Sequence, residues 1–367
     1  MSDYPDDDSL DQSTRGSASF AGVSVNWDAV WLAARLRKIP ATFVAVASES
    51  GVAESTLRNW DTDRVTTPSQ KNLDAVARAL DVPRRFLLRP DPIPPASHLT
   101  FRRKSAREMT DERDLFAAYA RLAAIFATFL LGGTWELNQT PDPLREPETW
   151  REGQVSARHL RARLGLDLST PMPDLVNLAE SLGVLVVYGP AMPEGLDACS
   201  AVVGGRRVIV VKQNDTDYFR QRWDVAHELG HFVMEHDSAG RENEAAANDF
   251  AQGLLFPWTM TNRRRLVGAV RDTDDLESLL NIQADWQVSV DALLTTAKKQ
   301  KIRGAQEKAM LLTKHREVGG LEVLPAESPT VLPNAADSAA LRHKRPIEAL
   351  AKEEGFPEDF VKLMVSH

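Results

Sequence analysis

The segment 224–236, with the sequence DVAHELGHFVMEH, constrains this chain more than any other stretch. His227 and His231 are four residues apart, and Glu228 directly follows the first of them. On a helix with about 3.6 residues per turn the two histidines share one face, so both imidazoles can reach one zinc ion. Glu228 points about a third of a turn away, where its carboxylate can act as a base on a water molecule beside the ion. The pattern predicts a catalytic zinc site.

A catalytic zinc usually takes three protein ligands and keeps one position open, so a third ligand is expected nearby. The turn residues DSAG at 237–240 precede ENEAAANDFAQGLLFP, which resumes a helical pattern and returns beside His231. Glu242 and Glu244 are the candidates, and we favour Glu244 because it shares a helix face with Asn248. Asn248 is expected to accept a hydrogen bond from a ligand imidazole. The alternative is an ordinary solvated helix that carries the short pattern by chance.

Composition limits which ligands a metal could have. The 367 residues include a single cysteine, Cys199, which rules out an internal disulfide framework and a thiolate-only zinc cage. Cys199 itself is expected to be a small buried apolar residue. Any transition metal here therefore depends on histidine and carboxylate ligands.

The HExxH pattern does not identify the group that stabilises the tetrahedral oxyanion, for which Tyr218 and His236 are candidates.

The stretch RRVIVVKQNDTDYFRQRWDVAHELGHFVMEH, followed by ENEAAANDFAQGLLFP, resembles the ImmA/IrrE family of metallopeptidases. That family pairs HExxH with a downstream E-x-x-A-N-x-F-A helix that ends in a proline, and the resemblance covers about residues 175–258. It implies an α+β zincin-like domain of the gluzincin type with a small sheet. It implies that Glu228 is the general base and that zinc is held by His227, His231 and Glu244. Its implied substrates are transcriptional repressors or antitoxins, often on mobile elements.

A second motif lies near the N-terminus, in FVAVASESGVAESTLRNW at residues 43–60. A small residue at the expected helix crossing and Gly51 at the expected turn follow the spacing of a helix-turn-helix. Residues 27–88 resemble the phage-repressor-like family of DNA-binding domains, which implies a five-helix domain. In that family the second motif helix enters the major groove by its N-terminal end.

The resemblance makes Ser55, Arg58 and Asn59 the expected DNA contacts, since arginine suits guanine and asparagine suits adenine. The family usually bonds a phosphate through a glutamine at the position of Phe43, so either Thr42 substitutes for it or DNA affinity is low. Residues 27–90 carry ten lysines and arginines against seven acidic residues, in a chain of net charge −8. The alternative is a helical bundle that works in protein contacts.

A nearly apolar run at 115–131 is too short for the ~20 residues of a membrane span, and it contains Arg121. We expect a buried or interface helix rather than a membrane contact. Its apolar seam has heptad-like spacing and is a candidate homodimer contact. The seam consists of Leu115, Tyr119, Leu122, Phe126 and Phe129.

The chain is expected to be a mainly α, multidomain protein. The segments VLVVYG and RRVIVVKQ are expected to be strands of the small sheet. The acidic start has neither a cationic nor an apolar leader segment, so a cytoplasmic location is expected. The expected divisions are a disordered acidic tail at 1–24, a helix-turn-helix domain at 25–90, a Pro-rich linker and apolar helix at 91–150, a metallopeptidase domain at 151–315, and a partly ordered tail at 316–367.

These features together predict a DNA-binding transcriptional regulator with a zinc-dependent endopeptidase domain. DNA at an operator and a protein substrate of the repressor or antitoxin type are the expected partners. Two alternatives stay open. The protein could be a repressor or antitoxin whose peptidase-like domain only senses or docks, or a protease whose helix-turn-helix recruits a repressor-like partner.

Overall fold

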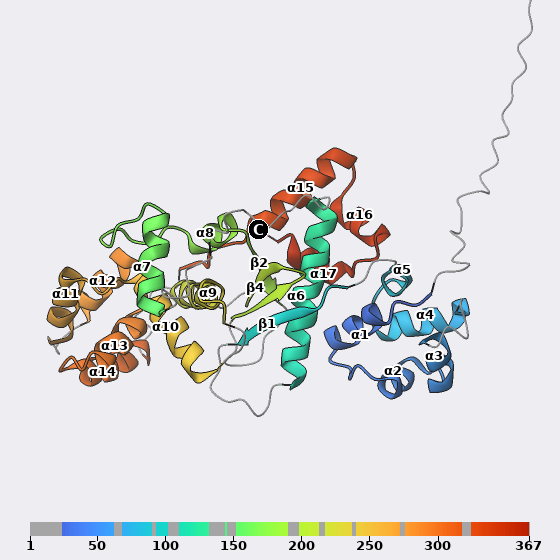
Figure 1. The fold of residues 1–367 in the computed structure, drawn as a ribbon, viewed down its shortest axis with the longest axis horizontal. Helices are drawn as coiled ribbons and strands as arrows, with labels where there is room; N and C mark the ends of the chain where they lie inside the picture. Colours follow the sequence, from blue (N-terminus) through green and yellow to red (C-terminus); the bar gives the residue numbers. More distant parts are fainter. Residues whose placement is uncertain are drawn as a thin grey trace, which may run out of the picture.

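The computed structural model places helices α1–α17 around one small sheet of strands β1–β4 (Figure 1). It describes residues 24–61, 68–89, 93–101, 110–131, 144, 152–189, 198–212, 217–236, 240–271, 276–317 and 324–366. The acidic segment expected to be disordered, 1–24, lies outside the described residues except at its last position.

The N-terminal helices form a compact group, here called the helical module, and five of them occur where the sequence indicates five. They are α1 (Trp27–Leu36), α2 (Phe43–Ser50), α3 (Glu54–Asp61), α4 (Gln70–Ala79) and α5 (Arg84–Leu87). Asn26, Thr42 and Ser69 cap the first, second and fourth helices through their side-chain oxygens. Gly51 ends α2 in the left-handed conformation, with φ 68°.

The sheet has the strand order β1-β3-β4-β2. Its strands are β1 (Ala96–Phe101), β2 (Val184–Gly189), β3 (Ala198–Val203) and β4 (Arg206–Lys212). The expected strands β2 and β4 pair in parallel, and β4 pairs antiparallel with β3 and β3 with β1. Strand β1 corrects the expected linker at 91–150, because the segment between the two prolines and the apolar helix completes the edge of the sheet.

Alternate residues of the strands face two separate hydrophobic cores. One core contains Val187, Val208 and Val210 with the helical module, the apolar helix and the C-terminal helices. The other contains Val186 and Ile209 with the helices of the middle of the chain. The helical module therefore shares a core with the sheet rather than standing as a separately packed unit.

The apolar helix α6 (Thr110–Leu131) lies between the sheet and the helical module in Figure 1. Its expected dimer seam is buried inside the chain: Leu122 and Phe126 have no exposed surface, and Leu115 and Tyr119 keep 3% and 4%. The ring of Tyr119 packs 5.5 Å from that of Phe360. The seam is thus a core contact and is not available as a dimer contact. No helix of the described residues is long and apolar enough to cross a membrane.

Within the segment 316–367, expected to be a partly ordered tail, residues 324–366 form an extended segment and three helices. These are α15 (Val331–His343), α16 (Ile347–Glu353) and α17 (Glu358–Met364). Phe356 and Phe360 from this part of the chain contact the ring of Phe126 in α6, at 5.0 and 5.7 Å. A few large apolar residues in an alanine-rich and charged sequence are enough to bury the segment.

The middle of the chain forms eight further helices within the described residues. They are α7 (Gly153–Arg163), α8 (Leu175–Ser181), α9 (Tyr218–Val233), α10 (Arg241–Leu255), α11 (Met260–Arg271), α12 (Glu277–Trp286), α13 (Val290–Lys299) and α14 (Ala305–Glu317). Helices α9 and α10 agree with the expected motif helix and its return. Gly230 lets them pack closely, because a Cβ there would lie 2.9 Å from the ring of Phe250.

Candidate metal centre

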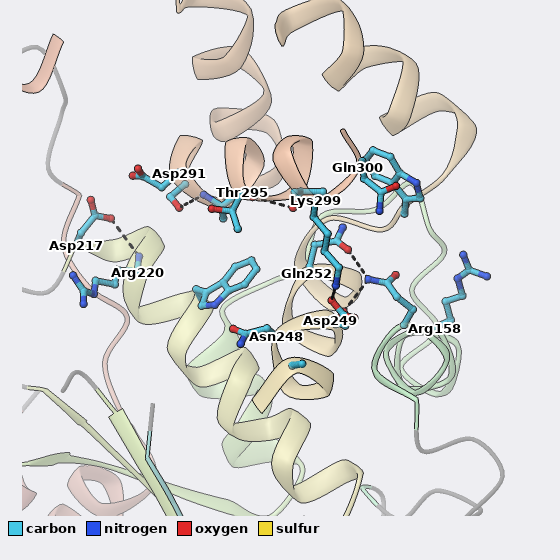
Figure 2. Close-up of a pocket in the computed structure, with 17 residues that line it drawn as sticks. Arg158, Asp217, Arg220, Asn248, Asp249, Gln252, Asp291, Thr295, Lys299 and Gln300 are labelled. Atoms are coloured by element: carbon cyan, nitrogen blue, oxygen red, sulfur yellow. Dashed lines mark hydrogen bonds and ion pairs between the residues drawn. The ribbon is translucent and has the colours of Figure 1, made fainter. Parts of the chain in front are cut away.

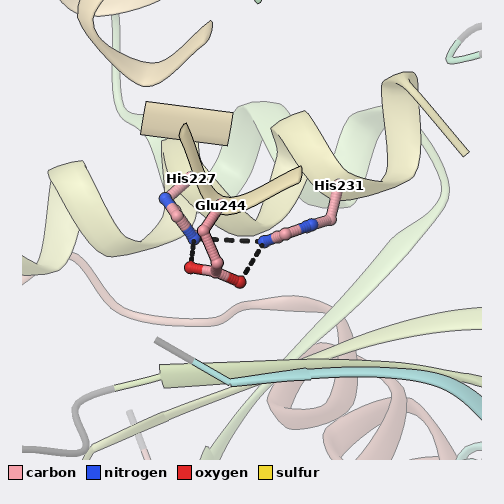
Figure 3. Close-up of side chains that lie close together, drawn as sticks. All are labelled: His227, His231 and Glu244. Atoms are coloured by element: carbon pink, nitrogen blue, oxygen red, sulfur yellow. Dashed lines mark hydrogen bonds and ion pairs between the residues drawn. The ribbon is translucent and has the colours of Figure 1, made fainter. Parts of the chain in front are cut away.

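Three side chains from α9 and α10 meet at one point (Figure 3). The Nε2 atoms of His227 and His231 lie 3.1 Å apart. The carboxylate of Glu244 approaches both imidazoles, with Oε2 at 3.3 Å from Nε2 of His227 and Oε1 at 3.3 Å from Nε2 of His231. The three residues favoured from the sequence as ligands are thus brought together by the antiparallel packing of the two helices.

The spacing of these atoms fits a shared cation. Ligand atoms held ~2.0–2.2 Å from a tetrahedral zinc ion lie roughly 3.3–3.6 Å from one another. The observed separations of 3.1 and 3.3 Å are close to that range. Two imidazole nitrogens and one carboxylate are also a donor set that suits zinc and similar transition metals. The cluster could therefore bind a metal ion.

Burial and charge prepare the cluster for a cation. His227 is fully buried, His231 is 2% exposed, and the Glu244 side chain keeps 24%. Burial alone would raise the pKa of the Glu244 carboxyl, but the hydrogen bonds and charge of the two histidines outweigh it and hold that pKa to about 2. The carboxylate is therefore ionised at neutral pH. Glu242, the other candidate ligand, is exposed on α10 and is not part of the cluster.

The candidate base Glu228 is fully buried beside the cluster. Its Oε2 accepts a hydrogen bond from Oγ1 of Thr100 at 2.8 Å and another from Oγ of Ser200. Its Oε1 is buried and has no hydrogen-bond partner within the described part of the chain. One carboxylate oxygen is thus held in place by two hydroxyls, and the other could accept a proton.

Sequence reasoning missed Thr100 and Ser200, which lie opposite each other on β1 and β3. Strand β3 could have been found, because Gly204 and Gly205, with φ 56° and 80°, form the two-residue turn of a hairpin before β4. Strand β1 has only a weak sequence pattern, and the two prolines before it suggest a linker. Pairing between residues a hundred positions apart leaves no local pattern.

The predicted role of Asn248 is wrong, and the contacts of His236 favour a different role from the one expected. Asn248 does not orient an imidazole: its Nδ2 donates to the backbone carbonyl of Glu244 at 2.7 Å, and Nδ1 of His227 has no partner among the described residues. His236 contacts a ligand histidine instead, with its Nδ1 3.0 Å from Nδ1 of His231. It follows the end of α9, where Glu235 adopts φ 52° and turns the chain back. His236 therefore fits the role of orienting a ligand better than that of stabilising an oxyanion.

Tyr218, the other candidate for stabilising an oxyanion, points elsewhere. It begins α9, ten residues before Glu228, which corresponds to about 15 Å along the helix axis. Its hydroxyl donates to Oε1 of Gln287 at 2.8 Å. Burial is the largest cause that raises the pKa of its phenol. The side chain is therefore a packing and hydrogen-bonding group at the far end of the helix.

A cleft of about 1000 Å³ opens between α7, α9, α10 and α13 (Figure 2). Trp223 lines it one turn before His227, and Asn248 lines it one turn after Glu244. Lys299 and Asp249 form an ion pair at its wall. The cleft thus begins about one helical turn from His227 and Glu244 and offers both aromatic and polar surface.

The residues expected to contact DNA lie on the helical module, away from the cluster (Figure 1). Ser55 and Arg58 are exposed on α3, and Asn59 is half-buried. Arg58 makes an ion pair with Glu54 at 2.6 Å and lies over the ring of Phe43. Oγ1 of Thr42 accepts a hydrogen bond from the amide of Ala45, so its oxygen already caps α2.

Residues 179–298 match the family model of the IrrE N-terminal-like domain, Peptidase_M78. The matched segment runs from α8 into α13 and contains the three clustered side chains and Glu228. This part of the chain is similar to metallopeptidase-type hydrolases, which typically depend on a metal, and a peptidase-related regulatory function is indicated. The helical module, β1 and α15–α17 lie outside the match. No curated protein matches the chain at a significant level.

Proposed function

We propose that this protein is a zinc-dependent endopeptidase that regulates transcription by cutting a repressor- or antitoxin-type protein. The observation that carries the proposal is the approach of His227, His231 and Glu244 to separations of 3.1–3.3 Å, with the buried carboxylate of Glu228 on the next residue of the same helix. Zinc is the metal we favour, because two imidazoles, one carboxylate and an open position are typical of its catalytic sites.

Some residues of the site would bind the metal, and Glu228 would transfer protons. When bound, zinc would polarise the scissile carbonyl and make water a stronger nucleophile at neutral pH. Glu228 uses its free Oε1 to take a proton from the attacking water and then passes it to the leaving amine. His227 and His231 are held by α9, and Glu244 by α10, so the cluster keeps its geometry through the reaction.

The cleft is the expected binding site of the protein substrate, and the helical module is the expected binding site of DNA. The cleft of about 1000 Å³ beside Trp223 and Asn248 is where we expect part of the substrate chain to lie. We expect operator DNA to bind α3 at the exposed Ser55 and Arg58 and the half-buried Asn59, with Thr42 near a phosphate. A protein that both contacts DNA and cleaves a regulator would link proteolysis to transcription.

The variant Glu228→Gln tests the catalytic part of the proposal. It keeps the size of the side chain and leaves all three ligands in place, so bound zinc and thermal stability should match the parent. An amide cannot accept the proton, so hydrolysis of a mixed peptide library, followed by mass spectrometry, should fall by ~10²–10⁴-fold. Equal hydrolysis by the parent and by Glu228→Gln would contradict a peptidase centre.

A second candidate function is a non-catalytic sensing or docking module in a repressor or antitoxin. The observation that favours it is burial, since His227 and Glu228 have no exposed surface, whereas a protein substrate must reach the metal and the water beside Glu228. Under this alternative, removing the metal with a chelator changes DNA affinity while no peptide is cut. Titration of operator DNA with and without zinc separates the two functions.

A further inference from the structure

The strand β1 supplies a side chain to the candidate catalytic base, although it lies outside the peptidase-like segment. Oγ1 of Thr100 is 2.8 Å from Oε2 of Glu228, and Oγ of Ser200 contacts the same oxygen. Thr100 and Ser200 are each 1% exposed, and their hydroxyls also contact each other. The three side chains form one buried polar group between the sheet and α9.

The register of the sheet places the two hydroxyls together. Thr100 lies opposite Ser200 in the antiparallel pair of β1 and β3, whereas Ser200 lies opposite Ile209 in the next pair. Ile209 belongs to the core on the α9 side of the sheet, so Ser200 and its partner Thr100 face α9. An irregularity between Ser97 and Thr100, with His98 at φ 50°, breaks the register before Thr100.

The chemistry of a buried carboxylate explains why such a pair matters. A carboxylate removed from water is costly to bury unless hydrogen-bond donors replace the water that it loses. Here both donors act on Oε2, and Oε1 is left without a partner among the residues that the structure describes. The hydroxyls therefore determine which oxygen of Glu228 is free and where it points.

Strand β1 is in turn fixed by the N-terminal half of the chain. Arg121 of α6 donates to the carbonyls of Pro94 at 2.8 Å and Ile93 at 3.1 Å, just before the strand. Ile93 is buried in the core that contains the helical module. The position of Thr100 thus depends on elements that precede the peptidase-like segment.

We propose that Thr100, with Ser200, is a positioning residue that orients Glu228 for proton transfer, so that peptidase activity requires β1 to be docked on β3. This inference rests on the proposed function. It adds a residue that the segment 179–298 alone does not contain.

The test uses the full chain with the variant Thr100→Val, which removes the hydroxyl and keeps a β-branched side chain of similar size. We expect kcat to fall by about 10–100-fold, the usual effect of losing a side chain that supports a metal-site residue, while KM and zinc content stay at the parent values. Thr100→Ser should restore kcat. The matched control is Ser97→Ala, which removes an exposed β1 hydroxyl that contacts the carbonyl of Val202 and Nδ1 of His98, not Glu228, and should leave kcat unchanged.

A second readout does not depend on cleavage. In protein loaded with Co²⁺, Thr100→Val should shift the visible absorption bands, because the neighbour of the open metal position has moved, and Thr100→Ser should return the parent spectrum. A parent-like kcat or spectrum in Thr100→Val overturns the inference, as does loss of the metal or of thermal stability, since the role would then be structural. If Glu228→Gln cleaves as the parent does, the proposed function fails, and the Co²⁺ spectrum alone then decides the role of Thr100.

Discussion

The metal cluster and the outer face of α3 are held in place to very different degrees. His227 and Glu228 are fully buried. His227 lies between α9 and α10, and Glu228 lies between α9 and the sheet. Arg58 on α3 has a side chain that is 57% exposed, and its contacts include an ion pair with Glu54 and the ring of Phe43. A buried site is determined by many contacts at once, whereas an exposed surface leaves its side chains free to adapt to a partner.

The largest effect should come from removing a ligand of the cluster. His227→Ala and Glu244→Ala should each lose bound zinc, because two protein ligands hold a metal poorly, and Glu242→Ala should retain it since Glu242 is exposed. Where zinc is present at about 1,000 times its Kd, the lost stabilisation is about 4 kcal/mol. Elemental analysis after gel filtration and thermal unfolding measure the two effects.

The control within this set is informative in both directions. Retention of stoichiometric zinc in Glu244→Ala together with its loss in Glu242→Ala would show that the ligand was wrongly assigned. If the parent protein, purified in the absence of chelator, contains no transition metal, the cluster does not bind one.

The second effect is a loss of stability at the N-terminal half of α9. Arg222 on α9 is fully buried and pairs with Glu327, whose side chain is 5% exposed and also accepts from the amides of Leu175 and Val176 at 2.8 and 3.0 Å. Glu327→Ala leaves a buried guanidinium without its charge partner, so we expect a loss of about 3–5 kcal/mol in unfolding free energy. Denaturant unfolding followed by tryptophan fluorescence measures it.

A matched control uses an exposed acidic residue from the same part of the chain. Glu358 pairs with Lys362 at 2.6 Å, four residues along α17, and both side chains are more than half exposed. Glu358→Ala should cost far less than Glu327→Ala, because water screens an exposed ion pair. Similar losses in the two variants would mean that the segment around Glu327 does not anchor α9.

The third effect lies on the exposed side of the comparison. If α3 reads operator DNA, Arg58→Ala should weaken binding by about 1–3 kcal/mol and relax sequence preference. Arg37 is the control, since it is an exposed arginine of the same module whose partner is Asp81 rather than a residue of α3. Fluorescence anisotropy with a selected operator and a scrambled duplex gives both values. Equal effects of the two variants would show that α3 is not the reading helix.

Sequence alone located the part of the site that depends on short-range spacing. His227, His231 and Glu244 lie on two consecutive helices joined by a turn, so their meeting follows from helix periodicity and one reversal of the chain. Thr100 and Ser200 could not be found this way, because they meet through a strand pair that spans a hundred residues. Local pattern therefore predicted the metal cluster and Glu228 but not the hydroxyls that hold it.

The same limit explains the errors in the fold. The seam with Leu122 and Phe126 has the spacing of a helix that packs on another helix, and spacing does not say whether the partner is a second copy or the same chain. In the structure the partners are the sheet, the helical module and α15–α17. Alanine and charge dominate the composition of residues 324–366, which predicts a partly ordered tail, although Phe356 and Phe360 are buried.

The smallest effect should come from the exposed contact between the helical module and the C-terminal helices. Arg85 of α5 and Glu354 lie 3.4 Å apart with side chains 55% and 43% exposed, so Arg85→Ala should change unfolding free energy by no more than about 0.2–1 kcal/mol. The neighbouring Gly355 is different: it adopts φ +85°, and a Cβ there would lie 2.7 Å from the backbone nitrogen of Phe86. Gly355→Ala should therefore cost more than Arg85→Ala, because the left-handed conformation and the close backbone approach both disfavour a side chain. Denaturant unfolding measures the loss of unfolding free energy in each variant. A larger loss in Arg85→Ala than in Gly355→Ala would show that the ion pair, rather than close packing, joins the helical module to the C-terminal helices.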